Sequence, residues 1–146
     1  MSATSHLALE SADLLRQFGD ASTDLLWIRS AETLRWEYLS PAFEAIYGLS
    51  REDVLAEERE AVEAQAGDAS PPQASSELTL RPWLNRIAAE DRPAALDAIE
   101  RARSGERVNL SYRILREPDA EVRWLRDTVF PLRDAQGAVT SIGGVA

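Results

Sequence analysis

The chain has 146 residues, a formal net charge of −9 and no cysteine. This length fits one domain with a single core, and the lack of cysteine excludes disulfides, thiolate metal sites and covalent cysteine chemistry. The acidic balance argues against nucleic-acid and anionic-membrane partners, and no apolar run reaches the ~20 residues of a membrane span, so we expect a cytoplasmic protein.

The first elements are predicted to be one helix and two strands. Residues 5–19 have apolar side chains at helical spacing, which predicts an amphipathic helix that flanks the domain. Its apolar stripe consists of Leu7, Leu14, Leu15 and Phe18. Residues 24–29 form a short apolar run, and residues 34–38 alternate with a period of two, so both are predicted strands. We therefore divide the chain into a flanking helix at 1–20 and a domain at 21–146.

Two helices are predicted next, followed by an acidic segment. Ser40 is expected to cap the first helix, and Gly48 to end it. Ser50 and Asp53 form a capping box for the second helix, which we expect to run as far as Glu63. The segment at about 56–79 is acidic, and its second half is rich in alanine, serine and proline. Such a composition buries too little apolar surface to offset the entropy of ordering, so we expect a flexible insertion there.

The second half of the chain predicts two helices and three strands. Residues 81–89 form a short helix, and residues 90–104 form a longer helix whose inward side is small. Residues 108–114, 121–132 and 137–145 are predicted strands joined by short turns. The order of elements predicts an α+β domain, in which a five-stranded antiparallel sheet carries helices on one face.

A series of short motifs runs in one order between residues 24 and 146. These motifs are Tyr38-Leu39-Ser40-Pro41-Ala42-Phe43, Tyr47-Gly48, Ser50-Arg51-Glu52-Asp53, Trp83 with Glu90-Asp91-Arg92, Tyr112-Arg113-Ile114, Val122-Arg123-Trp124 and Pro131-Leu132-Arg133-Asp134. Together they resemble the PAS domains of bacterial sensor histidine kinases and diguanylate cyclases. The resemblance implies a PAS-like sheet, a sensory role in signal transduction and no catalytic activity in the domain itself.

Two departures from the family's pattern affect this interpretation. Residues 56–78 are longer than the connection that the family usually has, which is why we interpret them as inserted. The chain stops where the family continues into an outgoing helix. We expect either an excised input domain, with an effector domain beyond the C-terminus, or a protein that lacks its output partner. A histidine kinase is the expected effector, as part of a two-component system.

The resemblance also limits the cofactors. Flavin domains of the light-oxygen-voltage type need an adduct-forming cysteine, photoactive-yellow-protein types need a thioester cysteine, and neither exists in this chain. Heme in this fold is usually held by a histidine on the long helix, but the only histidine is His6, outside the matched region. We therefore predict no cofactor, exclude histidine-ligated heme and cysteine-linked chromophores, and leave a noncovalent small molecule open.

We identify no catalytic residue and no metal ligand in the sequence. His6 lacks the surroundings of a phosphoacceptor, and we interpret Glu90 and Asp91 as acids that cap a helix. Aromatic and aliphatic side chains are the candidates for a ligand pocket, although for the aromatic ones packing alone is the safer interpretation. The candidates are Ile28, Phe43, Tyr47, Trp83, Ile87, Leu96, Ile99, Tyr112 and Trp124.

Three hypotheses about function follow. In the leading one, ligand or partner binding is relayed to the effector through the C-terminal strand, in a homodimer that the flanking helix forms. In the second, the domain binds no ligand and only dimerises and relays. The third is a small α+β enzyme or binding protein of the nuclear transport factor 2 type, which the lack of a histidine inside the domain argues against.

Overall fold

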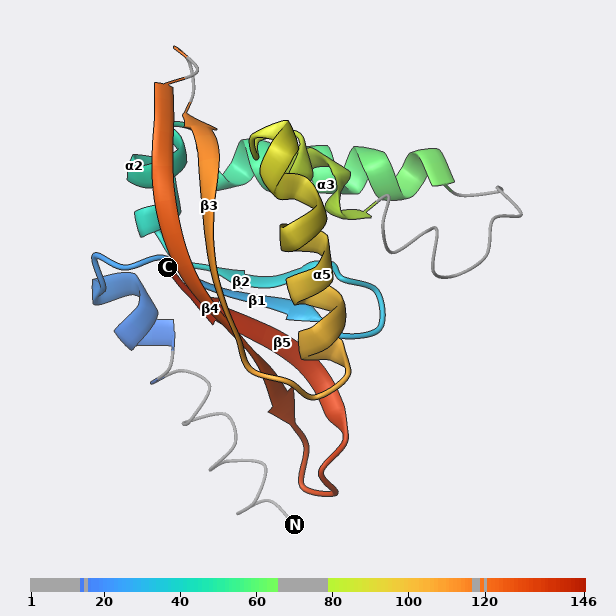
Figure 1. Ribbon diagram of the computed structural model, residues 1–146. Helices are drawn as coiled ribbons and strands as arrows, with labels where there is room; N and C mark the ends of the chain where they lie inside the picture. The colour runs from blue at the N-terminus through green and yellow to red at the C-terminus, as the bar shows by residue number, and fades with distance from the viewer. Residues whose placement is uncertain (1–13, 15, 66–78, 117–118, 120) are drawn as a thin grey trace.

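The computed structural model describes residues 14, 16–65, 79–116, 119 and 121–146, and it contains one antiparallel sheet (Figure 1). The strands are β1 (Leu26–Ser30), β2 (Trp36–Leu39), β3 (Val108–Arg116), β4 (Glu121–Arg133) and β5 (Val139–Val145). Their order across the sheet is β2-β1-β5-β4-β3, so the first and last strands of the chain pair at its centre. The predicted α+β class with a five-stranded antiparallel sheet is confirmed.

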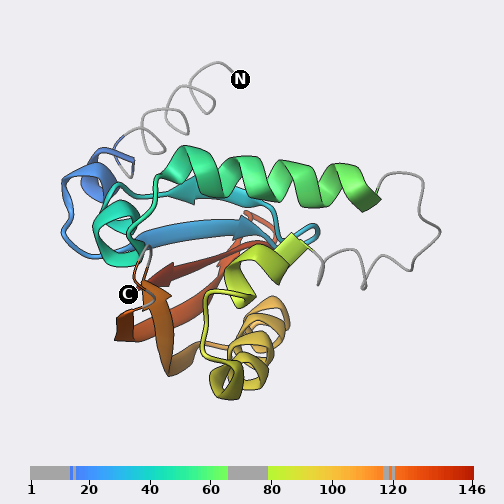
Figure 2. The ribbon, with the colours of Figure 1, turned by 90° about the horizontal axis from the view of Figure 1, so that it is seen from above.

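The helices connect the N-terminal strand pair to the C-terminal strands. They are α2 (Ala42–Tyr47), α3 (Arg51–Gln65), the short 3-10 helix η1 (Ala89–Asp91) and α5 (Arg92–Arg103), with further helical turns at 16–21 and 79–84. The helix α5 crosses the face of β3, β4 and β5, whereas α3 runs along the β2 edge of the sheet (Figures 1 and 2). Within the described residues, every helix is too short or too polar to cross a membrane.

The acidic segment begins as a helix. The helix α3 runs on to Gln65, two residues beyond the expected limit at Glu63, because its alanine and glutamate residues favour a helix. The remainder of the expected insertion, residues 66–78, lies outside the described residues, as do Leu7 and Leu15 of the flanking helix.

Small residues let α5 approach the sheet closely. Ala95, Ala98 and Ala102 are at most 1% exposed, and Ile99 fills the space between them and the strands. This is the small inward side that the sequence indicates. It places the core between α5 and one face of the sheet, which we call the inner face.

Ser40 does not cap α2. Its hydroxyl accepts a hydrogen bond from the Leu26 backbone N–H at 2.9 Å, and no side chain caps the helix. The reason is that Ser40 lies directly after β2, where the backbone of β1 is closer than the first turn of α2. The second predicted cap is present, because Asp53 N donates to the Ser50 hydroxyl at 3.1 Å.

Glu90 and Asp91 bind an arginine and do not cap α5. Asp91 Oδ2 accepts from Arg113 N at 2.8 Å and from Arg113 Nε at 2.9 Å, while Glu90 Oε2 accepts from Arg113 Nη2 at 2.7 Å. These bonds lower the pKa of the Asp91 carboxyl. The two acids therefore attach the start of α5 to the edge strand β3.

The last turn of the flanking helix contacts the outer face of the sheet. Tyr38 pairs with Ile28, so it points away from the core, and its hydroxyl donates to Asp20 at 2.8 Å. The described part of the apolar stripe is left uncovered, since Leu14 is 55% exposed and Phe18 is 75% exposed.

Two neighbouring glycines of β5 provide a test of this packing. A Cβ at Gly144 would overlap the Trp27 indole on the inner face, whereas a Cβ at Gly143 would lie 3.3 Å from Phe130 on the outer face. We expect Gly144→Ala to lower the free energy of unfolding by about 1–3 kcal/mol, and Gly143→Ala by less than about 1 kcal/mol. Urea unfolding measures both, and equal losses would contradict the assignment of faces.

Candidate functional site

A very small cavity lies between the sheet and the helices. Its volume is about 10 Å³, which holds about one water molecule. The residues that line it are Leu25, Trp27, Arg29, Trp36, Phe43, Tyr47, Trp83, Ile99 and Tyr112. The interior, which we call the chamber, is therefore filled by the protein's own side chains.

Most of the predicted pocket residues lie at this chamber or in the core beside it. Phe43, Tyr47, Trp83, Ile99 and Tyr112 line the chamber. Ile87 is fully buried in the same hydrophobic cluster, and Leu96 packs against that cluster while remaining partly exposed.

Ile28 and Trp124 lie on the outer face of the sheet, contrary to the expectation. In β1, Trp27 and Arg29 point into the chamber, so Ile28 between them points outward. Trp124 is 66% exposed, because Asp127 three positions along β4 is the inward residue. Alternation identifies the residues that share a face, but it does not reveal which face the helices cover.

A buried carboxylate joins three strands of the sheet. Asp127 on β4 is 1% exposed and accepts hydrogen bonds from Trp27 Nε1 on β1 at 3.2 Å and from the Tyr112 hydroxyl on β3 at 3.0 Å. Burial raises the pKa of this carboxyl to about 6, although both hydrogen bonds favour the charged form. We did not identify Asp127 from the sequence. The signal that could have revealed it is an acidic residue at a strand position where an apolar residue is expected.

A second pair of polar aromatic residues links the helices. Trp83 Nε1 donates to the Tyr47 hydroxyl at 3.2 Å, and the Tyr47 ring stacks on Phe43 with centroids 4.4 Å apart. Burial raises the pKa of Tyr47 to about 12, so its hydroxyl stays neutral at physiological pH. This pair connects the helical turn at 79–84 to α2 across the chamber.

A buried arginine occupies the side of the chamber next to β2. Arg29 is 2% exposed, and its guanidinium carbon lies 3.4 Å from the centroid of the Trp36 ring and 5.8 Å from that of Trp83. Its Nη1 donates to the Leu34 carbonyl at 2.6 Å and lies 3.5 Å from Glu58 Oε1. Burial lowers the pKa of Arg29 to about 10, so the group remains charged at neutral pH.

Glu58 connects this arginine to α3. Its Oε1 also accepts from the Trp36 backbone N–H at 2.9 Å, which is an outward-facing donor of the edge strand β2. Burial raises the pKa of the Glu58 carboxyl, while the bond from Trp36 and the charge of Arg29 act in the opposite direction. One carboxylate therefore attaches α3 both to the sheet and to the contents of the chamber.

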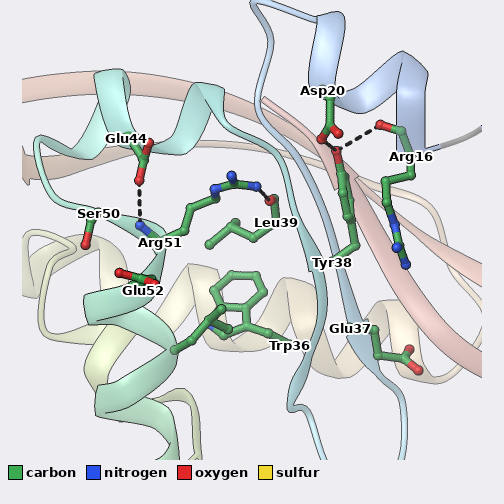
Figure 3. Close-up of a pocket in the computed structure, with 11 residues that line it drawn as sticks. Arg16, Asp20, Trp36, Glu37, Tyr38, Leu39, Glu44, Ser50, Arg51 and Glu52 are labelled. Atoms are coloured by element: carbon green, nitrogen blue, oxygen red, sulfur yellow. Dashed lines mark hydrogen bonds between the residues drawn. The ribbon is translucent and has the colours of Figure 1, made fainter.

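A larger groove lies on the surface between the helical turn at 16–21, β2 and the start of α3 (Figure 3). Its volume is about 650 Å³, but several of its polar groups bond one another. Tyr38 donates to Asp20, Arg51 N donates to Glu44 Oε2 at 2.9 Å, and Arg51 Nη1 donates to the Leu39 carbonyl at 3.0 Å. Its polar groups thus join the helices to β2, and the chamber remains the better candidate site.

The described residues contain no group of three or more side chains arranged to hold a metal ion. The chamber and its immediate surroundings combine one buried cation, Arg29, two buried carboxylates, Asp127 and Glu58, and a set of aromatic rings with hydrogen-bonding groups. Such an arrangement can bind a polar or charged group and can change the packing of its own side chains.

Comparison with known proteins identifies the family. Residues 72–146, just over half of the chain, match the family model described as the PAS fold, so the chain belongs to the PAS family. A search of curated protein sequences found no significant match. PAS domains are sensory modules of signalling proteins.

Solved structures support the same fold. The N-terminal domain of a diguanylate cyclase with PAS/PAC sensor from Marinobacter aquaeolei is 23% identical, with a TM-score of 0.58 over 84% of this chain and 91% of that chain. A domain of a putative light and redox sensing histidine kinase from Haloarcula marismortui is 20% identical, with a TM-score of 0.56 over 91% and 95%. The light-oxygen-voltage domain of the blue-light photoreceptor Aureochrome1 is 18% identical, with a TM-score of 0.54 over 90% and 85%.

The similarity to a light-oxygen-voltage domain does not extend to covalent flavin chemistry. This chain contains no cysteine, so no flavin–cysteine adduct can form in it. The shared feature is the fold.

The buried Asp127 carboxyl makes a prediction about pH. Because folding raises its pKa from 3.8 to about 6, the charged form is disfavoured in the folded protein, and stability falls as the pH rises from about 4 through 6. Asp127→Asn keeps a neutral, isosteric group and removes this dependence. We expect the free energy of unfolding of the original chain, relative to that of the variant, to fall by up to about 3 kcal/mol between pH 4 and pH 7.

Urea unfolding at several pH values measures this difference. Subtracting the variant removes the contributions of other carboxyls, such as Asp91, whose pKa shifts in the opposite direction. A difference that stays constant with pH would contradict a raised pKa at Asp127.

Proposed function

We propose that this chain is a sensory PAS module that relays a change in the packing of its chamber to an effector domain beyond its C-terminus. The observation that carries the proposal is the filled chamber, with a volume of about 10 Å³, which the buried Arg29 lines and whose side chains the buried Asp127 and Glu58 bind. A signal has to rearrange these side chains, because a ligand larger than a water molecule has no vacant space to enter. Relay of this kind is a population shift between two packings of one domain. It requires the ligand or partner to bind one packing with a higher affinity than the other.

The path from the chamber to the C-terminus is short. Trp27 contacts Gly144 of β5, and the Ala146 backbone pairs with Leu25 through bonds of 2.8 and 2.9 Å. A movement of the Trp27 indole therefore acts directly on the last residues of the chain. A histidine kinase is the effector we propose, supported by the family and by the fold shared with sensor kinase and diguanylate cyclase domains.

We also propose that two copies associate through the flanking helix. Leu14 and Phe18 are exposed on this helix, and Leu7 and Leu15 complete the predicted apolar stripe. Burying these side chains against a second copy removes apolar surface from water, which favours association. A cytoplasmic location and a bacterial source belong to the same proposal, whereas the family match argues against the nuclear transport factor 2 alternative.

The relay is tested by fusing the full chain, at Ala146, to the dimerisation and catalytic core of a sensor histidine kinase. Trp27→Phe removes the indole N–H that binds Asp127, and we expect it to change autophosphorylation by about threefold or more. Trp124→Phe is the matched control, since Trp124 is exposed on the outer face and its substitution leaves the rate unchanged. Equal rates for both folded variants would contradict a relay through the chamber.

Dimerisation is tested by analytical ultracentrifugation of the whole chain. We expect Leu14→Ser with Phe18→Ser to weaken dimerisation by tenfold or more, on the order of 1.4 kcal/mol, because both side chains lose apolar area at the proposed interface. Trp124→Ser alters the other exposed aromatic group, on the sheet. A dimer that survives the helix substitutions but dissociates with Trp124→Ser would contradict the helix-mediated interface.

A further inference from the structure

The groups around Arg29 form a binding site for a planar cation. The Trp36 indole lies at stacking distance from the guanidinium, and the Trp83 indole lies nearby. Nη1 donates to the Leu34 carbonyl and forms an ion pair with the Glu58 carboxylate. Aromatic faces and anionic oxygens in a water-excluded space are the groups that recognise cations, and a flat guanidinium gains most from stacking. We call Trp36, Trp83, Glu58 and the Leu34 carbonyl the cation box.

The backbone at Leu34 is specifically arranged for this box. Leu34 is fully buried and has a φ of 62°, which is the left-handed region that side chains other than glycine rarely adopt. Such a conformation is energetically costly and persists only where its surroundings hold it. Here it accompanies a carbonyl that accepts the 2.6 Å bond from Arg29 Nη1.

Stability alone does not account for an arginine in this place. Taking a charge out of water carries a large desolvation penalty, and replacing buried ion pairs by apolar residues of similar volume is often neutral or stabilising. Arg29 is nonetheless 2% exposed and has only one carboxylate beside it, at 3.5 Å. The aromatic and carbonyl contacts supply the remaining compensation, which indicates a site matched to the guanidinium group itself.

We propose that the cation box is a receptor for a planar cation, that the Arg29 guanidinium occupies it as a tethered ligand, and that a small molecule with a guanidinium or amidinium group is the class that competes for it. This inference rests on the proposed function and names the ligand class of the same chamber. Exchange of one guanidinium for another needs no vacant volume, which reconciles a filled chamber with sensing. It also separates Arg29 from Glu58 and so removes the link between β1 and α3, while the bond from the Trp36 N–H to Glu58 stays in place.

The test uses the whole chain with Arg29→Ala and ethylguanidinium, which is the part of the arginine side chain that this substitution removes. We expect ethylguanidinium to raise the melting temperature of the variant by about 3–5 °C at ten times its dissociation constant. Ethylammonium carries the same charge without the plane, and we expect it to have less than a quarter of this effect. Calorimetric titration then measures the affinity directly.

Two further variants control for nonspecific effects. Arg126→Ala removes an exposed arginine of β4, and we expect ethylguanidinium to leave its melting temperature unchanged. Arg29→Ala combined with Glu58→Gln keeps the cavity but lacks the carboxylate, and we expect its affinity to fall by tenfold or more. An equal response of Arg29→Ala and Arg126→Ala, or equal rescue by ethylammonium and ethylguanidinium, would overturn the proposal.

A second measurement uses the unmodified chain, in case Arg29→Ala does not fold. In nitrogen-15 NMR spectra we expect the Nη–Hη groups of Arg29, which donate within the box, to exchange with water at least 100-fold more slowly than those of the exposed Arg126, and Trp36→Leu to abolish this protection. Exchange of the Arg29 Nη–Hη groups at the rate of Arg126 would overturn the box. If ethylguanidinium fails to stabilise Arg29→Ala while Trp27→Phe still changes autophosphorylation in the kinase fusion, the cation receptor alone is refuted. If neither effect is observed, the relay is refuted as well.

Discussion

The burial of the Arg29 charge is the constraint on which much of this structure depends. A guanidinium that is 2% exposed has to find its compensation inside the protein, and three separate segments provide it. Trp36 of β2 stacks on it, the Leu34 carbonyl accepts its hydrogen bond, and Glu58 of α3 supplies the opposite charge. The bond that links α3 to β1 and the left-handed backbone at Leu34 both accompany this one charge.

A second buried carboxylate, Asp127, organises the other half of the interior. Its carboxylate gathers Trp27 and Tyr112 from two other strands, while Trp83 and Tyr47 join the helices on the far side. The polar atoms of these aromatic side chains are thereby satisfied, so the rings fill the volume without unpaired donors. This explains how a PAS interior rich in tryptophan and tyrosine leaves a cavity of only about 10 Å³.

A filled chamber changes how sensing has to work in this PAS domain. Any incoming group has to replace a side chain, and each candidate side chain is attached to an element that reaches the surface. Trp27 contacts β5 and the end of the chain, and Arg29 is attached through Glu58 to α3. A change in the packing of the chamber can therefore act on two parts of the protein, the C-terminus and α3.

The sequence by itself determined the α+β class, the antiparallel sheet and the small inward side of α5, because periodicity and capping signals are local. It also excluded covalent flavin chemistry, since the chain has no cysteine. Only the tertiary structure decided which face of each strand points inward. Ile28 and Trp124, which we predicted to line the pocket, point away from the core, whereas Arg29 and Asp127 point into it. Alternation of apolar and polar residues does not tell which face of a strand is buried. A buried charge is identified only when its partners, which lie far away in the chain, are brought beside it.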